Sequence, residues 1–312
     1  MAGINFASYP NITKLTIGNN TICNQSFSKA FNNMANLTNC TFPVENIINI
    51  SNMFCNCRNL ISKPVCGPKT TDMSYAYQNC RNMTGIPVCG ENVTNMSFAY
   101  ENCFKITGSP VCGPNVVDMS MSYVACNSLT GSPVCGSKVT NMQAAYARCT
   151  NLTGSPVCGE NVTTMYSAYV GCVNITGKPV CGNNVTNMGM AYNGCTKLTG
   201  APVCGPNVTN MQAAYFNCVN LSGNMYVYNN NINNFQNCFY GKNNSKMLNI
   251  YMHKNSVSLS SIKSAGAVSS LVGANITWYT NSTNSSIIYI TPYNIHIHMV
   301  DDVAAARAAN GD

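Results

Sequence analysis

One phrase returns every 23 residues through most of this 312-residue chain, and that fixed step limits the fold more than any other feature of the sequence. Each copy contains Pro-Val-Cys-Gly, with prolines at Pro64, Pro87, Pro110, Pro133, Pro156, Pro179 and Pro202. A tyrosine series keeps the same step, at Tyr77, Tyr100, Tyr123, Tyr146, Tyr169, Tyr192 and Tyr215. A period of roughly 20 to 50 residues is typical of stacked repeats that share one core.

Weaker copies of the repeat flank the regular ones. Phe27 and Phe31 stand at earlier methionine and tyrosine positions, while after Leu221 the pattern slips by one residue and Lys242 takes a cysteine position. Terminal repeats face water on one side and are therefore atypical. We expect an N-terminal capping segment over residues 1–33, a repeat region of about nine coils over 34–248, and a C-terminal cap and tail over 249–312.

The content of each repeat predicts a β-rich solenoid. A 23-residue period falls in the leucine-rich-repeat range and is too short for paired helices. Within a coil, proline confines the Pro-Val-Cys segment to a strand start or an edge. The segment from Met to Tyr and Cys has apolar residues every three or four positions, which suits a short helical or 3₁₀ stretch or successive corners of a tight coil.

The order Val-x-x-Met-x-x-Ala-Tyr-x-x-Cys-x-x-Leu-Thr, followed by proline, resembles the BspA-like leucine-rich repeats of bacterial and protist surface proteins. The phrase Asn-Val-Thr-Asn-Met at residues 92–96 is similar to their mycoplasma-lipoprotein branch. The resemblance covers about three quarters of the chain and implies a leucine-rich-repeat solenoid. It also implies a surface location, although the regular Pro-Val-Cys and the absence of a recognisable signal peptide depart from the family pattern.

Fifteen of the 19 cysteines form two series in the repeats, of seven and eight, and the odd total forbids complete pairing within the chain. Equivalent side chains of stacked strands point the same way with Cβ atoms about 4.8 Å apart, whereas a disulfide needs about 3.8 Å. Pairing inside one coil, for example Cys126 with Cys135, stays open, and the nine- and fourteen-residue spacings do not suit zinc. We interpret the Tyr-x-x-Cys series as a buried ladder of small apolar residues: Cys57, Cys80, Cys103, Cys126, Cys149, Cys172, Cys195 and Cys218.

The C-terminal region loses the repeat and predicts a small α+β cap. Residues 256–274 have helical spacing, 275–280 and 285–290 flank a turn signal, and 293–300 alternate as a strand does. His296 and His298 point to one face of that strand and could be metal ligands, a weaker interpretation than two solvent-facing histidines. The polar tail after Val300 could be loose or dock on a neighbour. We expect no cofactor.

Charge is scarce, at 8% of residues against about 25% in an ordinary soluble protein. The net charge of +7 comes from lysines spread about one per coil, and nucleic-acid binders usually gather such charge on one face. No apolar run is long enough to predict membrane insertion. Because carboxylates are few and no histidine falls in the regular repeats, the sequence offers no catalytic constellation, and we expect no enzyme and no nucleic-acid partner.

Repeat proteins recognise partners through the positions that vary from coil to coil. The candidate binding residues at such positions are Tyr75, Phe98, Met121, Phe104, Lys105, Tyr166, Met190 and Phe216. Low charge and asparagine-rich polarity favour a virion structural protein such as a phage tail fibre, baseplate or decoration protein. Its expected partners are other virion proteins or a host-surface glycan or protein, in a homo-oligomer or larger assembly. The alternative is a bacterial or protist cell-surface adhesin of the BspA-like type.

Overall fold

The computed structural model describes residues 6–18, 26–242, 245–256, 276–280, 286–290 and 294–312. It contains two compact units, Met1–Thr153 and Gly154–Asp312. The chain is mostly sheet-like, with few helices in these ranges. None of the helices in the described ranges has the length and hydropathy of a membrane-spanning segment.

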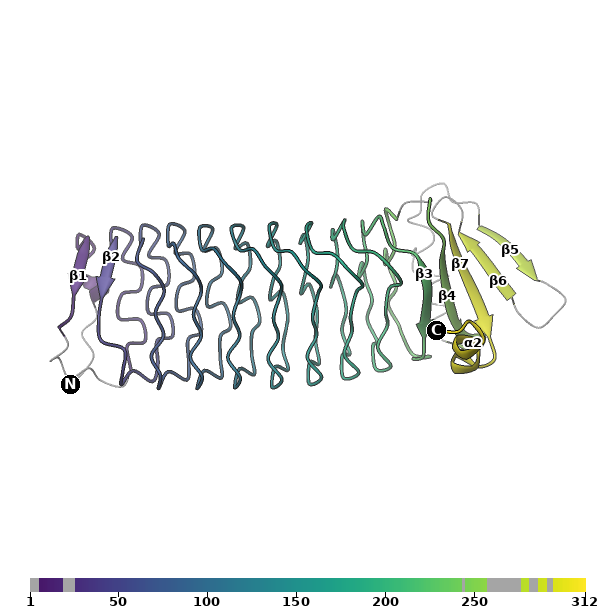
Figure 1. Ribbon diagram of the computed structural model, residues 1–312, viewed down its shortest axis with the longest axis horizontal. Helices are drawn as coiled ribbons and strands as arrows, with labels where there is room; N and C mark the ends of the chain where they lie inside the picture. The colour runs from purple at the N-terminus through teal and green to yellow at the C-terminus, as the bar shows by residue number, and fades with distance from the viewer. Residues whose placement is uncertain (1–5, 19–25, 243–244, 257–275, 281–285, 291–293) are drawn as a thin grey trace. The chain divides into compact units, whose positions relative to one another are not determined.

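The first unit begins with the 3₁₀-helix η1 (Phe6–Ser8) and the strands β1 (Lys14–Thr16) and β2 (Asn39–Thr41), which pair in parallel. Within each unit the repeats follow one another in chain order, and each is hydrogen-bonded to the next (Figure 1). Isolated parallel bridges between equivalent residues, such as Asp72 with Asn95, take the place of long strands.

Each repeat contains a run of tight turns. The N–H of Tyr75 donates to the carbonyl of Ser97, one repeat later, at 2.9 Å, and the N–H of Gln78 donates back to the carbonyl of Tyr75 at 3.2 Å. This alternation recurs in the repeats of both units, so some N–H groups tie neighbouring repeats together while others close the turns. The sequence of this segment was compatible with either a short helix or a series of corners, and the structure contains the corners.

The residue before each methionine starts the run of turns. Asp72 Oδ1 accepts the N–H of Ser74 at 2.9 Å, and Asn95 Oδ1 accepts the N–H of Ser97 at 3.0 Å. An aspartate or asparagine that bonds its own backbone two residues on makes a turn of the Asx type. The Asn or Asp before methionine is therefore a turn-forming position.

The tyrosines form a buried column that closes each coil. In the first unit the rings of Tyr100 and Tyr123 are nearly parallel with centroids 5.5 Å apart, and in the second unit those of Tyr192 and Tyr215 are 5.6 Å apart. The Tyr123 hydroxyl donates to the carbonyl of Val111 at 2.6 Å and accepts the N–H of Val111 at 3.1 Å. Every regular repeat that carries Pro-Val has the same pair of bonds between a tyrosine hydroxyl and a valine.

Proline explains why a side chain has to make these bonds. Proline has no N–H to donate to a neighbouring strand, so the Pro-Val-Cys segment does not join its neighbours as a regular strand. The valine N–H and carbonyl would then lie without partners next to the core. The tyrosine hydroxyl, which both donates and accepts, supplies both partners from across the coil.

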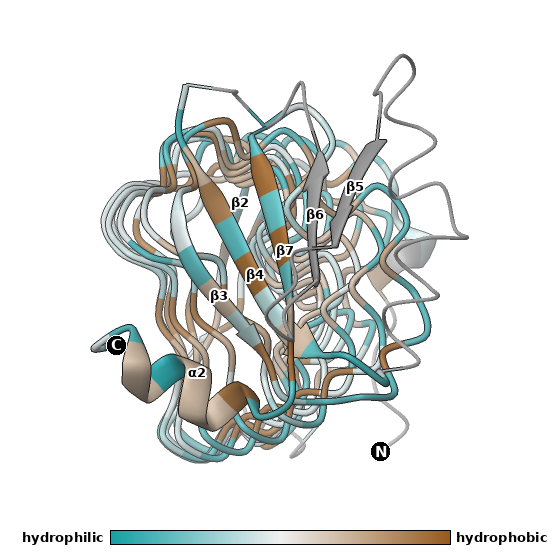
Figure 2. Ribbon diagram, turned by 90° about the vertical axis from the view of Figure 1, so that its right-hand side faces the viewer, coloured by the Kyte–Doolittle hydropathy of each residue, from teal (hydrophilic) through white to brown (hydrophobic). Residues whose placement is uncertain are grey.

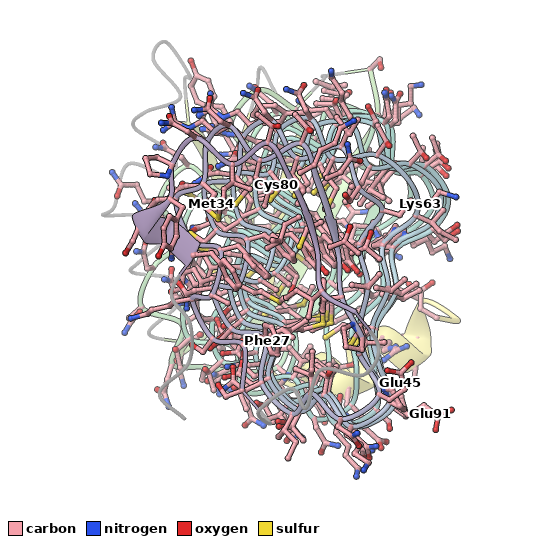
Figure 3. The ribbon with its side chains drawn as sticks, turned by 90° about the vertical axis from the view of Figure 1, so that its left-hand side faces the viewer. Phe27, Met34, Glu45, Lys63, Cys80 and Glu91 are labelled. Atoms are coloured by element: carbon pink, nitrogen blue, oxygen red, sulfur yellow. The ribbon has the colours of Figure 1, made fainter. Side chains whose placement is uncertain are left out.

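The core lies between the turns and the Pro-Val-Cys segments. Met73, Tyr77 and Cys80 are 0 to 1% exposed, as are their equivalents along each unit. Figure 3 shows Cys80 inside the ribbon and Lys63 and Glu91 at its edge. A thin core of long, unbranched or flat side chains fills the narrow space between the two walls of each coil.

The second unit ends in a five-stranded sheet of order β3-β4-β7-β6-β5. Its parallel part comprises β3 (Gly223–Val227), β4 (Leu248–His253) and β7 (Ile295–Val300). The strands β5 (Ile276–Thr280) and β6 (Ser286–Ile290) continue it as an antiparallel hairpin. Hydrophobic and hydrophilic residues alternate along β4 and β7 (Figure 2), so one face packs inward and the other faces out.

The sheet confirms the two strands expected at 275–280 and 285–290 and the strand predicted for 293–300, while the turn expected between the first two lies outside the described residues. The helix expected over 256–274 lies outside the described residues except for Ser256. The tail forms a short helix, α2 (Val303–Ala309), whose N-cap Asp302 accepts the N–H groups of Ala304 and Ala305.

Replacing Tyr123 with phenylalanine should lower the free energy of unfolding by about 1–3 kcal/mol, because it leaves the Val111 N–H and carbonyl unpaired beside the core. Urea denaturation followed by circular dichroism measures the loss. Tyr75→Phe is the matched control, since the Tyr75 hydroxyl makes no hydrogen bond among the described residues, and it should change stability by less than about 0.5 kcal/mol. Equal effects of the two variants would contradict the bridging role.

Candidate functional site

Two positions in each run of turns have positive φ, and the contrast between them defines the candidate site. The later position is filled mostly by asparagine or glycine, the residues that tolerate this conformation best: Asn33, Asn56, Asn79, Asn102, Ala125, Arg148, Gly171, Gly194, Asn217 and Gly241. The earlier position is less uniform, because five of its ten residues are larger than asparagine and the others are asparagine, alanine or serine: Lys29, Asn52, Tyr75, Phe98, Met121, Ala144, Ser167, Met190, Ala213 and Asn237. We call this earlier position the turn column.

In the first unit the turn column carries an aromatic pair. The rings of Tyr75 and Phe98 stack with centroids 4.4 Å apart and planes 8° from parallel, and Met121 has the next place in the column. All three side chains are half-buried, and their φ values are 57°, 58° and 54°. A non-glycine residue in this region costs about 1 kcal/mol, so the three positions hold bulky side chains against the preference of the backbone.

Polar side chains from the same turns flank the aromatic pair. Gln78 Nε2 donates to Glu101 Oε2 at 2.6 Å. The amides of Asn56, Asn79 and Asn102 form a ladder in which each Nδ2 donates to the Oδ1 of the preceding repeat at 2.8–2.9 Å. The turns of the first unit therefore present three apolar side chains, Tyr75, Phe98 and Met121, which we call the apolar stripe. Neutral and acidic hydrogen-bonding groups lie beside it.

Two other predicted residues of the first unit, Phe104 and Lys105, lie on the turn that follows Cys103. The guanidinium of Arg81 lies over the ring of Phe104, 5.8 Å from its centroid, and Phe104 is half-buried. Lys105 is exposed. The structure gives no contact that joins Phe104 or Lys105 to the apolar stripe within the described ranges.

The second unit contains the remaining predicted residues in two separate contacts. Tyr166 reaches Met190 through its hydroxyl, 3.9 Å from Sδ. The ring of Phe216 stacks on Tyr240 with centroids 4.9 Å apart. Tyr166, Met190 and Phe216 are all half-buried. Tyr240 was not among the predicted residues, because the one-residue slip after Leu221 hides its equivalence to Phe216.

The eight cysteines predicted as a core ladder lie fully buried, and we call them the inner cysteines. They do more than fill space. Cys103 Sγ donates to the carbonyl of Tyr77 at 3.0 Å and Cys126 Sγ to that of Tyr100 at 3.0 Å, in each case a tyrosine of the preceding repeat. Burial raises the pKa of the Cys57 thiol to about 12. A buried, protonated thiol is a poor nucleophile.

The Pro-Val-Cys thiols are half-buried, apart from Cys204, which is buried; we call them the outer cysteines. Within each unit these thiols lie against the glycine of the next repeat, as Cys66, Cys89, Cys112, Cys158 and Cys181 do: a Cβ on Gly113 would be 3.0 Å from Cys89 Sγ and 2.7 Å from the carbonyl oxygen of Gly90. The glycine after each outer cysteine is therefore required by close packing. Burial raises the pKa of Cys89 to about 12, and all 18 cysteines in the described ranges are thiols.

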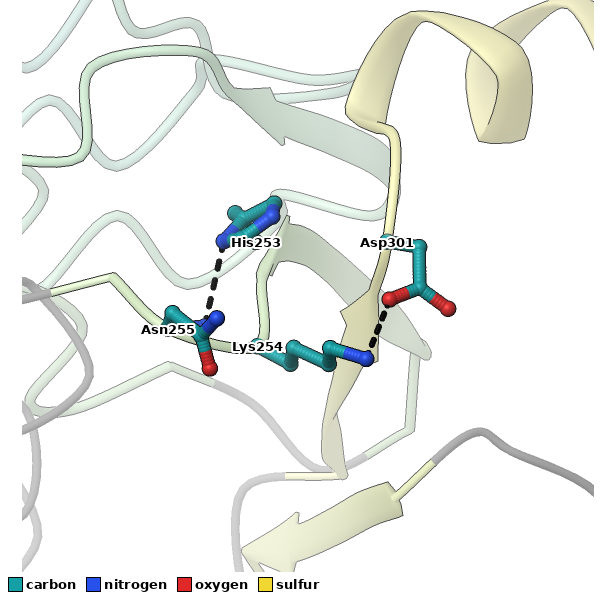
Figure 4. Close-up of polar contacts among 4 residues, drawn as sticks. All are labelled: His253, Lys254, Asn255 and Asp301. Carbon is teal, nitrogen blue, oxygen red and sulfur yellow. Dashed lines mark hydrogen bonds and ion pairs between the residues drawn. The ribbon is translucent and has the colours of Figure 1, made fainter.

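His296 and His298 lie on the outward face of β7, as the sequence predicted, with ring centroids 6.4 Å apart. His298 stacks on Tyr251 at 4.5 Å, and its Nε2 lies 3.1 Å from Asn249 Oδ1. Nearby, Lys254 forms an ion pair with Asp301 at 2.5 Å (Figure 4). No group of three or more potential metal ligands occurs among the described residues.

A chain of amides fixes the proton on His298. The carboxylate of Asp312 can only accept, so it orients Asn224 Nδ2 at 2.8 Å, and Asn249 Nδ2 in turn donates to Asn224 Oδ1 at 2.9 Å. Asn249 Oδ1 is therefore an acceptor, and His298 carries a proton on Nε2. Burial, and then the neighbouring His296, lower the pKa of His298.

The sequence missed this network because it joins residues far apart in the chain. Each contributing strand carries a signal, since Asn224 and Tyr226, Asn249 and Tyr251, and His296 and His298 occupy equivalent alternate positions. The tail completes the arrangement: Tyr226 donates its hydroxyl proton to Asp312 at 2.6 Å. Only the sheet register brings these pairs together.

Comparisons with known proteins gave no match: no family model, curated protein or solved structure is similar to this chain. The BspA-like resemblance therefore stays a prediction. A function for this protein has to be inferred from the contacts, burial and charges of its own residues.

Because burial raises the pKa of inner and outer thiols such as Cys57 and Cys89, and the inner thiols are also the more deeply buried, iodoacetamide at about pH 8 should alkylate the outer cysteines slowly and the inner cysteines hardly at all. Peptide mass spectrometry of the folded protein measures both rates. After denaturation most of the 19 cysteines should react. Inner cysteines that react as fast as outer ones, or peptides linked by disulfides, would contradict this account.

The lowered pKa values of His296 and His298 predict a loss of stability in acid. A histidine whose folded pKa lies below its unfolded value of about 6.5 contributes stability that is complete above that value and is lost as the pH falls. Urea midpoints should therefore fall between about pH 7 and pH 5. The double variant His296→Gln/His298→Gln should fall less, and an unchanged slope would count against this assignment.

Proposed function

We propose that this protein is a non-enzymatic recognition protein, a solenoid of leucine-rich-repeat type displayed on a virus particle. In this role it is a tail fibre, baseplate or decoration protein, assembled with copies of itself or other virion proteins, and it presents its repeat surface to a host glycan or protein. The BspA-like resemblance and the 23-residue period support the solenoid assignment. Low charge and asparagine-rich polarity support the location on a particle.

The reactive residue types of the repeats are committed to holding the coils together. The inner thiols donate to backbone carbonyls, and the tyrosine hydroxyls bridge valine N–H and carbonyl groups. Side chains used in this way are not available for chemistry with a substrate. This commitment favours a scaffold that carries a contact surface.

The observation that carries the proposal is the contrast between the two positive-φ positions. The later position follows the backbone preference, whereas the turn column holds Tyr75, Phe98 and Met121 although asparagine fits the same slot at Asn52. A chain that satisfies the preference at one position and disregards it at the other, four residues earlier, retains those side chains for a reason other than backbone conformation. Half-buried aromatic residues beside amides are the composition expected of a contact surface.

The stacking also limits which parts of the apolar stripe a partner can contact. One face of Tyr75 and one of Phe98 are covered by the other ring. A partner therefore meets the edges of the stack and the flanking amides rather than an open ring face. Such a surface is flat and elongated along the repeats.

Replacing Tyr75 and Phe98 with asparagine should abolish attachment without unfolding the protein. Asparagine relieves about 1 kcal/mol at each positive-φ position, while the lost aromatic pair costs about 0.5–1.5 kcal/mol, so stability should stay nearly constant. Flow cytometry of labelled protein on host cells measures attachment. Lys29→Asn, in the same column and at nearly the same φ, is the control and should attach normally.

Two outcomes would contradict the proposal. Normal attachment of the folded Tyr75→Asn/Phe98→Asn variant would show that the stripe is not the contact surface. Absence of the chain from purified particles washed in high salt, judged by mass spectrometry, would exclude the virion role.

A further inference from the structure

The first unit contains a surface hollow of about 590 Å³ that the sequence did not reveal. Its lining comes from five consecutive repeats: Ile48, Lys69, Thr71, Asn92, Thr94, Asn115, Val117 and Lys138. These residues belong to two columns. The first column lies two positions after each Pro-Val-Cys glycine or its equivalent, and the second lies two positions after the first. No carboxylate is among the lining residues.

A lysine stands at each end of the hollow. Lys69 Nζ donates to Asn46 Oδ1 at 2.9 Å, and Lys138 Nζ donates to Asn115 Oδ1 at 2.6 Å. Both lysines are exposed, and neither forms an ion pair with another described residue. A neutral amide takes up one donor of each ammonium and leaves its charge uncompensated. The ends of the hollow therefore attract anionic groups.

The middle of the hollow has the opposite character. Asn92 and Asn115 use their Nδ2 groups on the carbonyls of Pro68 and Glu91, at 2.8 and 2.9 Å. Thr94 uses its hydroxyl proton on the carbonyl of Thr71 at 3.2 Å. These donors are thus directed into the protein. Asn92 Oδ1 and the Thr94 hydroxyl oxygen are left as acceptors, while Asn115 Oδ1 accepts from the Lys138 ammonium.

We propose that this hollow binds an acidic oligosaccharide. Sugar hydroxyls are donors that match the amide and hydroxyl oxygens in the middle, and carboxylates match the two ammonium groups at the ends. Ile48 and Val117 offer apolar surface to the C–H faces of sugar rings. This inference rests on the proposed recognition role and names the class of ligand for it.

The spacing of the charges favours a sugar acid over a nucleic acid. Lys69 and Lys138 are three repeats apart, which is roughly 14 Å at about 4.8 Å per stacked strand. A nucleic-acid strand carries a charge about every 3.4 Å along the duplex axis, and its binders gather more cations than this hollow offers. An oligosaccharide with widely spaced acid groups fits two ammonium groups and a neutral centre.

Isothermal titration of the full chain with tetragalacturonate and with a hyaluronan tetrasaccharide tests the proposal. We expect at least one to bind, more weakly at high salt, and its methyl-esterified form to bind at least about fivefold more weakly. Lys69→Gln and Lys138→Gln should each weaken binding about fivefold. Lys63→Gln, an exposed lysine of the same unit outside the hollow, is the control and should change binding less than about twofold.

Several outcomes would overturn the inference: no binding of either acid at millimolar concentration, equal binding of the esterified form, or an equal loss in Lys63→Gln. Tighter binding of an oligothymidylate of similar length would assign the hollow to nucleic acid instead. These outcomes are separable from the proposed function. Attachment that depends on Tyr75 and Phe98 but not on Lys69 and Lys138 would leave the recognition role intact and remove this ligand assignment.

Discussion

The hydrogen bonds between the tyrosine hydroxyl and the valine backbone decide how these repeats can be built. A wall that begins with proline cannot join its neighbours through a regular ladder, so its polar groups need partners from elsewhere. The Tyr123 hydroxyl supplies them for Val111 from the opposite wall, which ties the two walls of one coil together. The neighbouring repeat is held by the other wall, where turn N–H groups donate from one repeat to the next. Closure within a coil and cohesion between coils are therefore separate tasks of two different walls.

That division accounts for the other constant residues. The turn wall reverses direction so often that two positions per repeat take positive φ, and the tyrosine carbonyl in it receives a second donor from an inner cysteine. A thiol is small enough to be buried in this thin core and still donates weakly to a carbonyl. The glycine after an outer cysteine is required by the close approach of the preceding repeat. The residue types at the remaining, outward positions are free to vary. These positions include the turn column and the two columns that line the hollow.

Most of the repeat register could be read from the sequence because identical residues recur at one step. The placement of Lys242 in a cysteine position is confirmed: it is 3% exposed and its N–H donates to the carbonyl of Phe239, as that of Cys218 does to Tyr215. Conformation within the repeat was harder, because apolar spacing of three or four residues suits both a helix and a run of turns. The hollow was not predicted because its lysines are part of an even spread of charge along the sequence. The His298 network was not predicted because the sheet register decides which strands meet. Neither is encoded in any one local pattern.

Lys242 shows how a repeat adapts when it loses its neighbour in register. In the regular coils the inner thiol donates backward, to a tyrosine carbonyl of the preceding repeat. After the one-residue slip the same slot holds a longer side chain, and Lys242 Nζ donates forward to the carbonyl of Lys246. Burial, and then the charge of Lys246, lower the pKa of Lys242 to about 8, so this repeat bears a cost in desolvation that the thiols avoid. The forward bond falls just before β4, where prolines are absent and a regular parallel ladder with β3 begins. The exchange of a thiol for an amine therefore marks the point at which the chain changes from coils closed by tyrosine to a sheet held by its own backbone.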